Sequence, residues 1–122
     1  MNGLQKILVI EDDPDIGMML KMMLEFKGYA VTVSERPDFV NEILAQTSPH
    51  LIIMDMLLSG ANGLDICNTL KSSDTTSHLP VIMISAHPHA QKACLAAGAD
   101  DFIEKPFEMD ALLSKVTRLV SQ

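Results

Sequence analysis

Residues 7–13 read Ile-Leu-Val-Ile-Glu-Asp-Asp, an apolar run that ends directly in three carboxylates. A second run, Leu-Ile-Ile-Met at residues 51–54, is followed at once by Asp55. Short continuous apolar runs are typical of strands that are buried on both faces of a parallel sheet. Because such strands end at the same edge of the sheet, we expect the two runs to deliver their carboxylates to one place.

The rest of the chain alternates between strand-like and helix-like segments. Strands are predicted at residues 7–10, 30–34, 51–54, 81–84 and 101–103. Apolar residues at helical spacing follow each strand, in segments that open near Pro14, Pro37, Gly63, Ala90 and Met109. This alternation predicts an α/β protein with helices on both faces of a parallel sheet: the flavodoxin-like (βα)5 doubly wound fold, in a single domain over residues 1–122.

The composition restricts the class of protein. With 122 residues, of which 48% are apolar, the chain is long enough to bury a core as one globular domain. Its net charge of −7 and its scattered Lys and Arg residues argue against direct nucleic acid binding. Cys67 and Cys94 are expected to be reduced core residues. The sequence has neither a secretory signal nor an apolar run of membrane length, so we expect a cytoplasmic protein without membrane contact.

The carboxylates fall where a ligand site is expected. In doubly wound sheets, ligands bind beyond the strand C-termini, at the point where the strand order reverses. With strand order 2-1-3-4-5, that point lies between the first and third strands, which end in Glu11-Asp12-Asp13 and in Asp55. Carboxylates this close raise each other's pKa unless a cation neutralises them, and oxygen ligands favour Mg²⁺. The sequence therefore predicts a magnesium site.

Four motifs, each at a predicted strand end, carry a family resemblance. They are residues 7–14, Asp55 with Gly63 eight residues later, Ser85-Ala86, and Lys105-Pro106-Phe107. With these motifs the chain resembles the receiver domain of two-component response regulators over its full length. The resemblance implies that a histidine kinase or a histidine phosphotransfer protein phosphorylates Asp55 in a Mg²⁺-dependent reaction. It also implies a downstream effector domain or protein, and no enzymatic activity beyond the domain's own phosphorylation and dephosphorylation.

The resemblance assigns roles to individual residues. The magnesium ligands would be Asp12, Asp55 and the backbone carbonyl of Leu57, with Glu11 acting through water. Lys105 would place a positive charge beside the phosphoryl oxygens, and the Ser85 hydroxyl would donate a hydrogen bond to one of them. In the switch of the family, Ser85 moves toward the phosphoryl group and Phe102 turns inward. This movement would change the surface of the fourth helix, fifth strand and fifth helix.

Simpler readings of the same residues stay open. Glu11 and Asp12 would also suit a helix N-terminus, and Asp13, directly before Pro14, suits a helix cap. Ser85 is compatible with an ordinary turn, Lys105 with a solvated charge, and Phe102 with a plain core aromatic. Asp55 is harder to explain in this way, because a buried carboxylate without a partner is costly.

Two departures from the family pattern concern loops near the site. Residue 59 is Ser where the family commonly has Pro, which predicts a less rigid loop. The stretch between Ser85 and Gly98 is about two residues shorter than the family pattern, which leaves the start of the fourth helix open.

The first predicted helix carries more apolar residues than one buried face requires. Ile16, Met19, Leu20 and Met23 have the core-facing spacing, while Met18 and Met22 lie beside them near the acidic loop. Flexible thioethers suit a partner surface, so we expect Met18 and Met22 to contact the phosphodonor. Half-buried helix packing is the alternative for both.

Two functions other than phosphoacceptor signalling fit parts of the sequence. The first is a phosphorylation-independent interaction module that keeps only the receiver fold, which Mg²⁺ binding would discriminate. The second is a flavin carrier with the same strand order. The acidic loop after the first strand argues against the flavin carrier because it would repel a phosphate, and the chain has no Trp and a single Tyr for stacking.

Overall fold

A computed structural model describes residues 4–36, 38, 40–58 and 60–120. The strands are β1 (Lys6–Ile10), β2 (Ala30–Ser34), β3 (Leu51–Asp55), β4 (Leu57–Leu58), β5 (Ala61–Asn62), β6 (Val81–Ser85) and β7 (Asp101–Glu104). The helices are α1 (Pro14–Phe26), α2 (Val40–Thr47), α3 (Gly63–Ser72), α4 (Ala90–Ala96) and α5 (Met109–Val120). The five predicted strands are all present, and three of them extend one residue beyond their predicted C-terminal ends.

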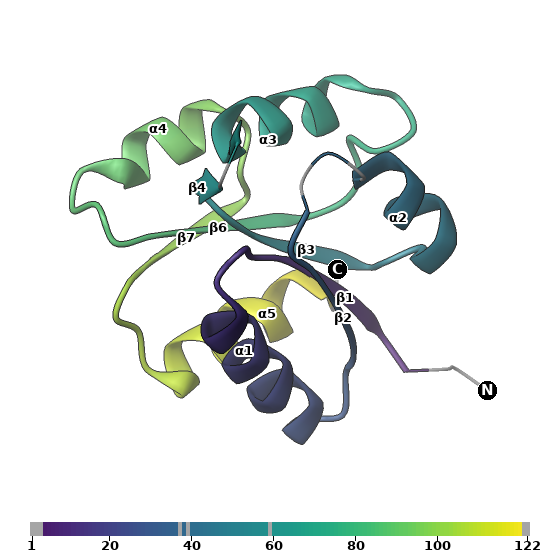
Figure 1. Cartoon of the computed structure of the whole chain (residues 1–122), viewed down its shortest axis with the longest axis vertical. Helices are drawn as coiled ribbons and strands as arrows, with labels where there is room; N and C mark the ends of the chain where they lie inside the picture. The colour runs from purple at the N-terminus through teal and green to yellow at the C-terminus, as the bar shows by residue number, and fades with distance from the viewer. Residues whose placement is uncertain (1–3, 37, 39, 59, 121–122) are drawn as a thin grey trace.

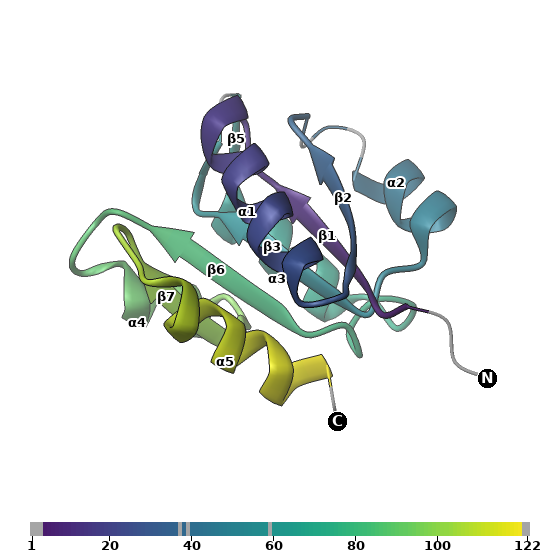
Figure 2. The same cartoon turned by 90° about the horizontal axis from the view of Figure 1, so that it is seen from below.

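The main sheet has five parallel strands in the order β2-β1-β3-β6-β7. Counted along the chain without the short β4 and β5, this is the order 2-1-3-4-5, which confirms the prediction. Helices α1 and α5 cover one face of the sheet, and α2, α3 and α4 cover the other (Figures 1 and 2). The molecule is therefore a three-layer α/β/α domain, as the alternation of segments indicated.

The strands are buried on both faces, and their alternating side chains form two separate cores. Leu8 and Ile10 of β1 belong to the core under α2, α3 and α4, while Ile7 and Val9 belong to the core under α1 and α5. Cys67 of α3 and Cys94 of α4 are both buried free thiols in the first of these cores. Burial raises the pKa of both thiols, that of Cys94 to about 11.

The buried face of α1 differs from the predicted one. Gly17, Leu20 and Leu24 form the buried line, whereas Met19 is exposed and Met23 is half-buried. A Cβ atom on Gly17 would lie 3.0 Å from Cγ1 of Val33, so the absent side chain lets α1 approach β2 closely at this point. The helix therefore turns its glycine toward the sheet, and the predicted core role of Met19 is wrong.

Three local features compare differently with the predicted pattern. The short antiparallel pair β4 and β5 follows Asp55, and strands of two residues are too short to leave a periodicity in sequence. Helix α2 starts at Val40, and residues 37 and 39, at its predicted opening, lie outside the described residues. Helix α4 begins at Ala90, where it was predicted, and has seven residues.

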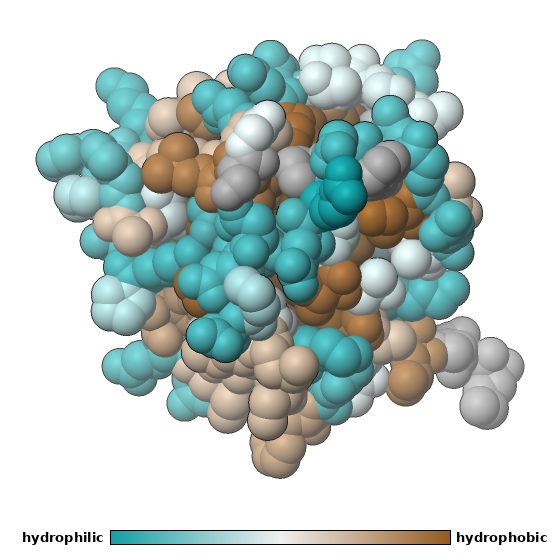
Figure 3. Space-filling view, in the orientation of Figure 1, coloured by the Kyte–Doolittle hydropathy of each residue, from teal (hydrophilic) through white to brown (hydrophobic). Residues whose placement is uncertain are grey.

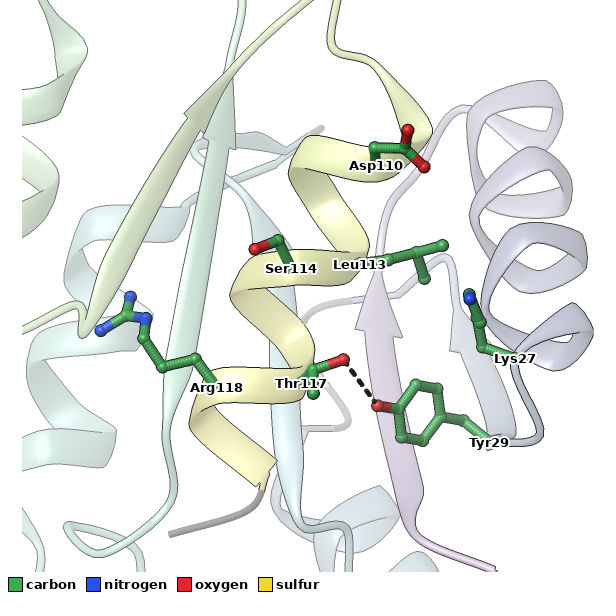
Figure 4. Close-up of a pocket in the computed structure, with 7 residues that line it drawn as sticks. All are labelled: Lys27, Tyr29, Asp110, Leu113, Ser114, Thr117 and Arg118. Atoms are coloured by element: carbon green, nitrogen blue, oxygen red, sulfur yellow. Dashed lines mark hydrogen bonds between the residues drawn. The ribbon is translucent and has the colours of Figure 1, made fainter.

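A groove of about 540 Å³ separates α5 from the turn between α1 and β2 (Figure 4). The hydroxyl oxygens of Tyr29 and Thr117 lie 3.4 Å apart across it, and Arg118 is directed away from Tyr29. None of the residues that line this groove belongs to the predicted site. No helix within the described ranges combines the length and the apolar character that a membrane span needs.

Candidate functional site

The register of the sheet brings Glu11 and Asp55 together. Ile10 of β1 pairs with Met54 of β3, so the residue that follows each of them lies at the same level of the sheet. The backbone N–H of Glu11 donates a 3.0 Å hydrogen bond to the carbonyl of Ser34, which holds Glu11 in line with β1 and beside β2. Both carboxylic residues are buried, with exposed fractions of 2% for Glu11 and 7% for Asp55.

Lys105 provides the cation for these two carboxylates. It follows β7, and its backbone N–H donates a 2.8 Å hydrogen bond to the carbonyl of Ser85 at the end of β6. Its ammonium Nζ donates hydrogen bonds to Oδ2 of Asp55 and, at 3.3 Å, to Oε1 of Glu11. The C-terminal ends of β1, β3 and β7 thus converge on one ion cluster, which we call the acidic cluster: Glu11, Asp55 and Lys105.

The charges of the acidic cluster are not balanced. Burial raises the pKa of Glu11 to about 7, helped by the negative charge of Asp55 and opposed by the Asp13 N–H and by Lys105. Burial alone would lower the pKa of Lys105, but its hydrogen bond to Asp55 and the two carboxylate charges outweigh it, so this pKa is raised. One ammonium therefore faces two carboxylates, and the cluster can accept further positive charge.

The second oxygen of Asp55 is fixed by the backbone that follows it. Oδ1 accepts a 2.8 Å hydrogen bond from the N–H of Leu57, the first residue of β4. Gly63 stabilises the same segment, because its N–H donates a 2.8 Å bond to the Met56 carbonyl. A Cβ on Gly63 would clash with the Asp55 carbonyl oxygen and would lie 2.9 Å from that of Met56. The glycine at this position of the motif thus lets α3 start against the end of β3.

Ser85 ends β6 next to the acidic cluster. Its partner in β7 is Glu104, the residue before Lys105, and the neighbouring pair in β3 and β6 is Asp55 with Ile84. The side chain is buried, and its Oγ accepts a 3.0 Å hydrogen bond from the N–H of His87. Since that bond uses an acceptor lone pair, the hydroxyl proton stays available for another acceptor.

The two aspartates after Glu11 have different environments. Asp13 is exposed and is the N-cap of α1, where its Oδ1 accepts hydrogen bonds from the N–H groups of Asp15 and Ile16. Asp12 lies between Glu11 and Asp13 in the β1–α1 loop and is half-buried. Across the described ranges, no three His, Cys, Asp or Glu side chains are grouped closely enough to hold a metal ion together. Asp13 therefore acts as the helix cap that its position before Pro14 suggested.

The remaining predicted residues are not members of the acidic cluster. Phe102 is buried in the core under α2, α3 and α4, in the row of paired residues that also contains Met54 and Met83. Met18 and Met22 are exposed on α1, so half-buried packing does not describe them. Ser59 lies outside the described residues, and His89, at the N-cap of the short helix α4, makes no side-chain capping bond.

A second ion cluster at the start of β7 was not predicted. The carboxylate of Asp101 is held by Nζ of Lys115, at 3.1 Å, and by the guanidinium of Arg118, both on α5. Burial raises the pKa of Asp101, but the Phe102 N–H and the two cations outweigh it, so this pKa is lowered. The spacing of Lys115 and Arg118 on one helix turn was visible in the sequence, but only the fold shows that this turn lies beside Asp101.

Comparison with known proteins identifies the family of the chain. The family model for the response regulator receiver domain matches residues 7–117. The chain is 34% identical to the phosphate regulon transcriptional regulatory protein PhoB of Rhizobium meliloti (strain 1021), over 96% of this chain and 52% of that protein. It is 32% identical to the DNA-binding dual master transcriptional regulator RpaA of Synechocystis, over 94% of this chain and 48% of that protein. The chain thus spans about half the length of these curated relatives.

Solved structures show the same fold. A putative response regulator from Chloroflexus aurantiacus J-10-fl superposes with a TM-score of 0.93 at 27% identity, covering 98% of this chain and all of the other. The receiver domain of the sensor histidine kinase PA1611 from Pseudomonas aeruginosa PAO1, solved with a magnesium ion in its active-site cleft, superposes with a TM-score of 0.88 at 24% identity, covering 98% and 100%. With the family model matching nearly its whole length, the chain belongs to the response regulator receiver domain family.

Proposed function

We propose that the chain, as one domain over residues 1–122, is the phosphoacceptor of a two-component phosphorelay and carries the phosphoryl group on Asp55. The observation that carries this proposal is the environment of Asp55. Its carboxylate is buried at the C-terminal edge of the sheet. One carboxylate oxygen accepts a hydrogen bond from the Leu57 N–H, and the other accepts one from the Lys105 ammonium. A carboxylate held in this way can attack a phosphoryl group in line and form an acyl phosphate.

The types of donor near Asp55 suit a magnesium ion, which proteins commonly hold with one or two carboxylates while water completes its coordination, so it does not need three grouped side chains. Glu11, Asp12 and Asp55 offer carboxylate oxygens, and Leu57 offers a backbone carbonyl, so the set consists of hard oxygen ligands with excess negative charge. We assign Asp12, Asp55 and the Leu57 carbonyl as ligands, with Glu11 acting through water. Bound Mg²⁺ would neutralise charge on the phosphoryl oxygens.

Lys105 and Ser85 complete the proposed chemistry. Lys105 already donates to Asp55 and would supply a fixed positive charge to a phosphoryl group there, at no cost of reorganisation in the reaction. The Ser85 hydroxyl, one strand away, would donate its proton to a phosphoryl oxygen. We propose that Ser85 and Phe102 then shift the surface formed by α4, β7 and α5, and that this surface signals to a downstream effector domain or protein.

The proposed phosphodonor is a histidine kinase or a histidine phosphotransfer protein. Such a donor must bring its phosphohistidine to the edge of the sheet where β3 ends, and α1 starts at this edge directly after Asp13. Met18 is four residues into α1, about 6 Å along the helix axis from its start. We therefore propose that the exposed Met18 and Met22 contact the phosphodonor.

The domain has no separate substrate in this proposal, since its only reactions are its own phosphorylation and dephosphorylation. We propose no direct contact of this domain with nucleic acid or membrane. Two free buried cysteines agree with a reducing compartment, so we place the domain in the cytoplasm.

The test is phosphorylation of the purified chain by acetyl phosphate, read by intact mass spectrometry with and without Mg²⁺. We expect an adduct of one phosphoryl group that requires Mg²⁺, and complete loss of the adduct in Asp55→Asn. Asp101→Asn is the matched control. It removes a partly buried carboxylate from the ion cluster of Asp101, Lys115 and Arg118, and the variant should still form the adduct. An adduct that persists in Asp55→Asn contradicts the assignment, and absence of any Mg²⁺ binding would favour the phosphorylation-independent module.

A further inference from the structure

The outer face of α1 is an exposed methionine cluster. Met18, Met19 and Met22 have exposed fractions of 56%, 41% and 64%, and Phe26 continues the same row at the end of the helix. Met18, Met22 and Phe26 are four residues apart, so they form one stripe, with Met19 next to it. Figure 3 shows the apolar surface that covers α1 at the lower centre of the view. A surface helix normally carries polar side chains on its outer face, so an exposed apolar stripe beside charged residues such as Glu25 is unusual for a free protein.

The other methionines provide an internal contrast. Met54 and Met83 are in the central strands β3 and β6 and have no exposed surface. Met109, at the start of α5, is exposed but belongs to a different helix. Solvent access controls how fast a thioether is oxidised. The fold therefore separates reactive thioethers on α1 from protected ones in the sheet.

We propose that Met18, Met19 and Met22 form an oxidation site through which peroxide controls phosphotransfer to this domain. The sulfur attacks one oxygen of hydrogen peroxide, the O–O bond breaks, and an S–O bond forms. The sulfur loses two electrons and becomes a sulfoxide, and the other peroxide oxygen leaves as water. Methionine sulfoxide reductases reverse this step, so the change can act as a switch.

The expected effect follows from polarity and from position. A sulfoxide replaces an apolar thioether with a strong dipole, which costs free energy when a partner buries it without a hydrogen bond. This part of the inference rests on the proposed function, in which the phosphodonor docks on α1. The acidic cluster and Ser85 contain no sulfur, and Glu11, Asp55 and Ser85 are buried, so phosphorylation by a small molecule should not depend on the oxidation state of α1.

The first experiment maps oxidation. The purified full chain is treated with hydrogen peroxide, and tryptic peptides are followed in time by mass spectrometry. We expect Met18, Met19 and Met22 to be oxidised well before Met54 and Met83 while the far-ultraviolet circular dichroism stays unchanged. Equal oxidation rates at α1 and in β3 and β6, in a chain that stays folded, would overturn the proposal.

The second experiment compares two phosphorylation routes before and after peroxide. The probes are acetyl phosphate and a phosphohistidine donor, selected from purified histidine kinases and histidine phosphotransfer proteins for labelling that requires Asp55. We expect transfer from the phosphohistidine protein to slow by at least about threefold, with no change for acetyl phosphate, and sulfoxide reductase to restore the rate. The triple variant Met18→Leu, Met19→Leu, Met22→Leu keeps an apolar face without sulfur and should be insensitive to peroxide. The variant Met109→Leu is the matched control and should stay sensitive.

The outcomes separate this inference from the proposed function. Selective oxidation of α1 without any effect on protein phosphotransfer would overturn the inference and leave Asp55 as acceptor. Peroxide sensitivity that persists in the triple leucine variant would also overturn it. Absence of Asp55 labelling from both donors in the untreated chain would instead contradict the proposed function. Sedimentation that shows a dimer dissociating on oxidation would identify a second copy as the occupant of α1 and would contradict docking of the phosphodonor.

Discussion

Strand β7 connects two ion clusters of opposite charge balance. At its C-terminal end, one ammonium, that of Lys105, serves the carboxylates of Asp55 and Glu11. At its start, one carboxylate, that of Asp101, serves the cations of Lys115 and Arg118. In the second cluster two cationic side chains face one carboxylate, whereas in the first, one cationic side chain faces two carboxylates. The comparison indicates that the second cluster stabilises the packing of α5 on the sheet, while the first is suited to take up a further cation.

The pKa values of the two clusters follow this balance. Burial raises the pKa of Glu11 to about 7, and Asp55 adds to this effect, because a single ammonium does not compensate two buried negative charges. Burial acts in the same direction on Asp101, but its N–H donor and two cations reverse the sign and lower its pKa. Two clusters of three charged groups each thus shift the pKa of a carboxylate in opposite directions. The cluster with the excess of carboxylates is the one that contains the proposed acceptor, Asp55.

The largest effect should follow from removing the shared cation of the acidic cluster. Lys105→Met leaves Asp55 and Glu11 buried without their ammonium, and we expect the free energy of unfolding to fall by about 2 to 4 kcal/mol at pH 8 in EDTA. Phosphorylation by acetyl phosphate should fall as well, since a positive charge is lost beside the phosphoryl group. Urea unfolding and intact mass spectrometry measure the two effects.

Lys115→Met is the matched control for this variant. It removes a cation from the other cluster, where Arg118 remains with Asp101, so we expect a loss of less than about 1 kcal/mol and normal phosphorylation. Equal losses of stability in the two variants would contradict the difference between the clusters.

The second effect is the pH dependence of stability, which should have opposite sign in the two clusters. The folded-state pKa of Glu11 is about 7 and its ordinary value 4.5, so between these values the folded chain holds a proton that the unfolded chain has lost. The free energy of unfolding should therefore fall as the pH rises from 4.5 to 7, by about 3 kcal/mol at most. Glu11→Gln should remove this slope, which urea unfolding at pH 5 and pH 8 in EDTA measures. A slope that is unchanged in Glu11→Gln would mean that another group is responsible.

The smallest effect belongs to Asp101. Its pKa is lowered from 3.8, so its stabilisation is present above pH 3.8 and is lost as the pH falls through the lower, folded-state value. Because Arg118 is largely exposed, we expect Asp101→Asn to cost about 1 kcal/mol at pH 7, and less in high salt. Thermal melting at pH 7 and pH 3 is the measurement, and an equal cost at both values would argue against an ionic origin.

Much of this fold was predictable from the chain because its strands carry a simple signal. The runs at residues 7–10 and 51–54 are apolar throughout, as strands buried on both faces must be, and each ends in a carboxylate. Parallel pairing then places Glu11 beside Asp55 without further information. The face that α1 buries was not predictable from apolar spacing alone, since the close approach at Gly17 decides it, and a missing side chain has no hydropathy.

The sequence indicated which residues form the candidate site but not how their side chains contact one another. Lys105 was expected near the phosphoryl group, yet only the fold shows that its ammonium lies on both Asp55 and Glu11. The position of Asp13 before Pro14 already suggested the cap of α1, and the hydrogen bonds that Asp13 accepts from Asp15 and Ile16 show it. The contacts of Lys105 join residues far apart in sequence, so motif spacing cannot supply them.

The two buried thiols can report when the helices that cover them separate from the sheet. Cys67 and Cys94 lie in the core between the sheet and the α3 and α4 helices, and their raised pKa values keep them as poor nucleophiles while they are covered. An alkylating reagent would reach them only when this layer separates from the sheet. The rate of alkylation would then measure how often this helix layer opens, without any added label. Comparing the rates with and without phosphorylation would show whether the opening changes with the signalling state.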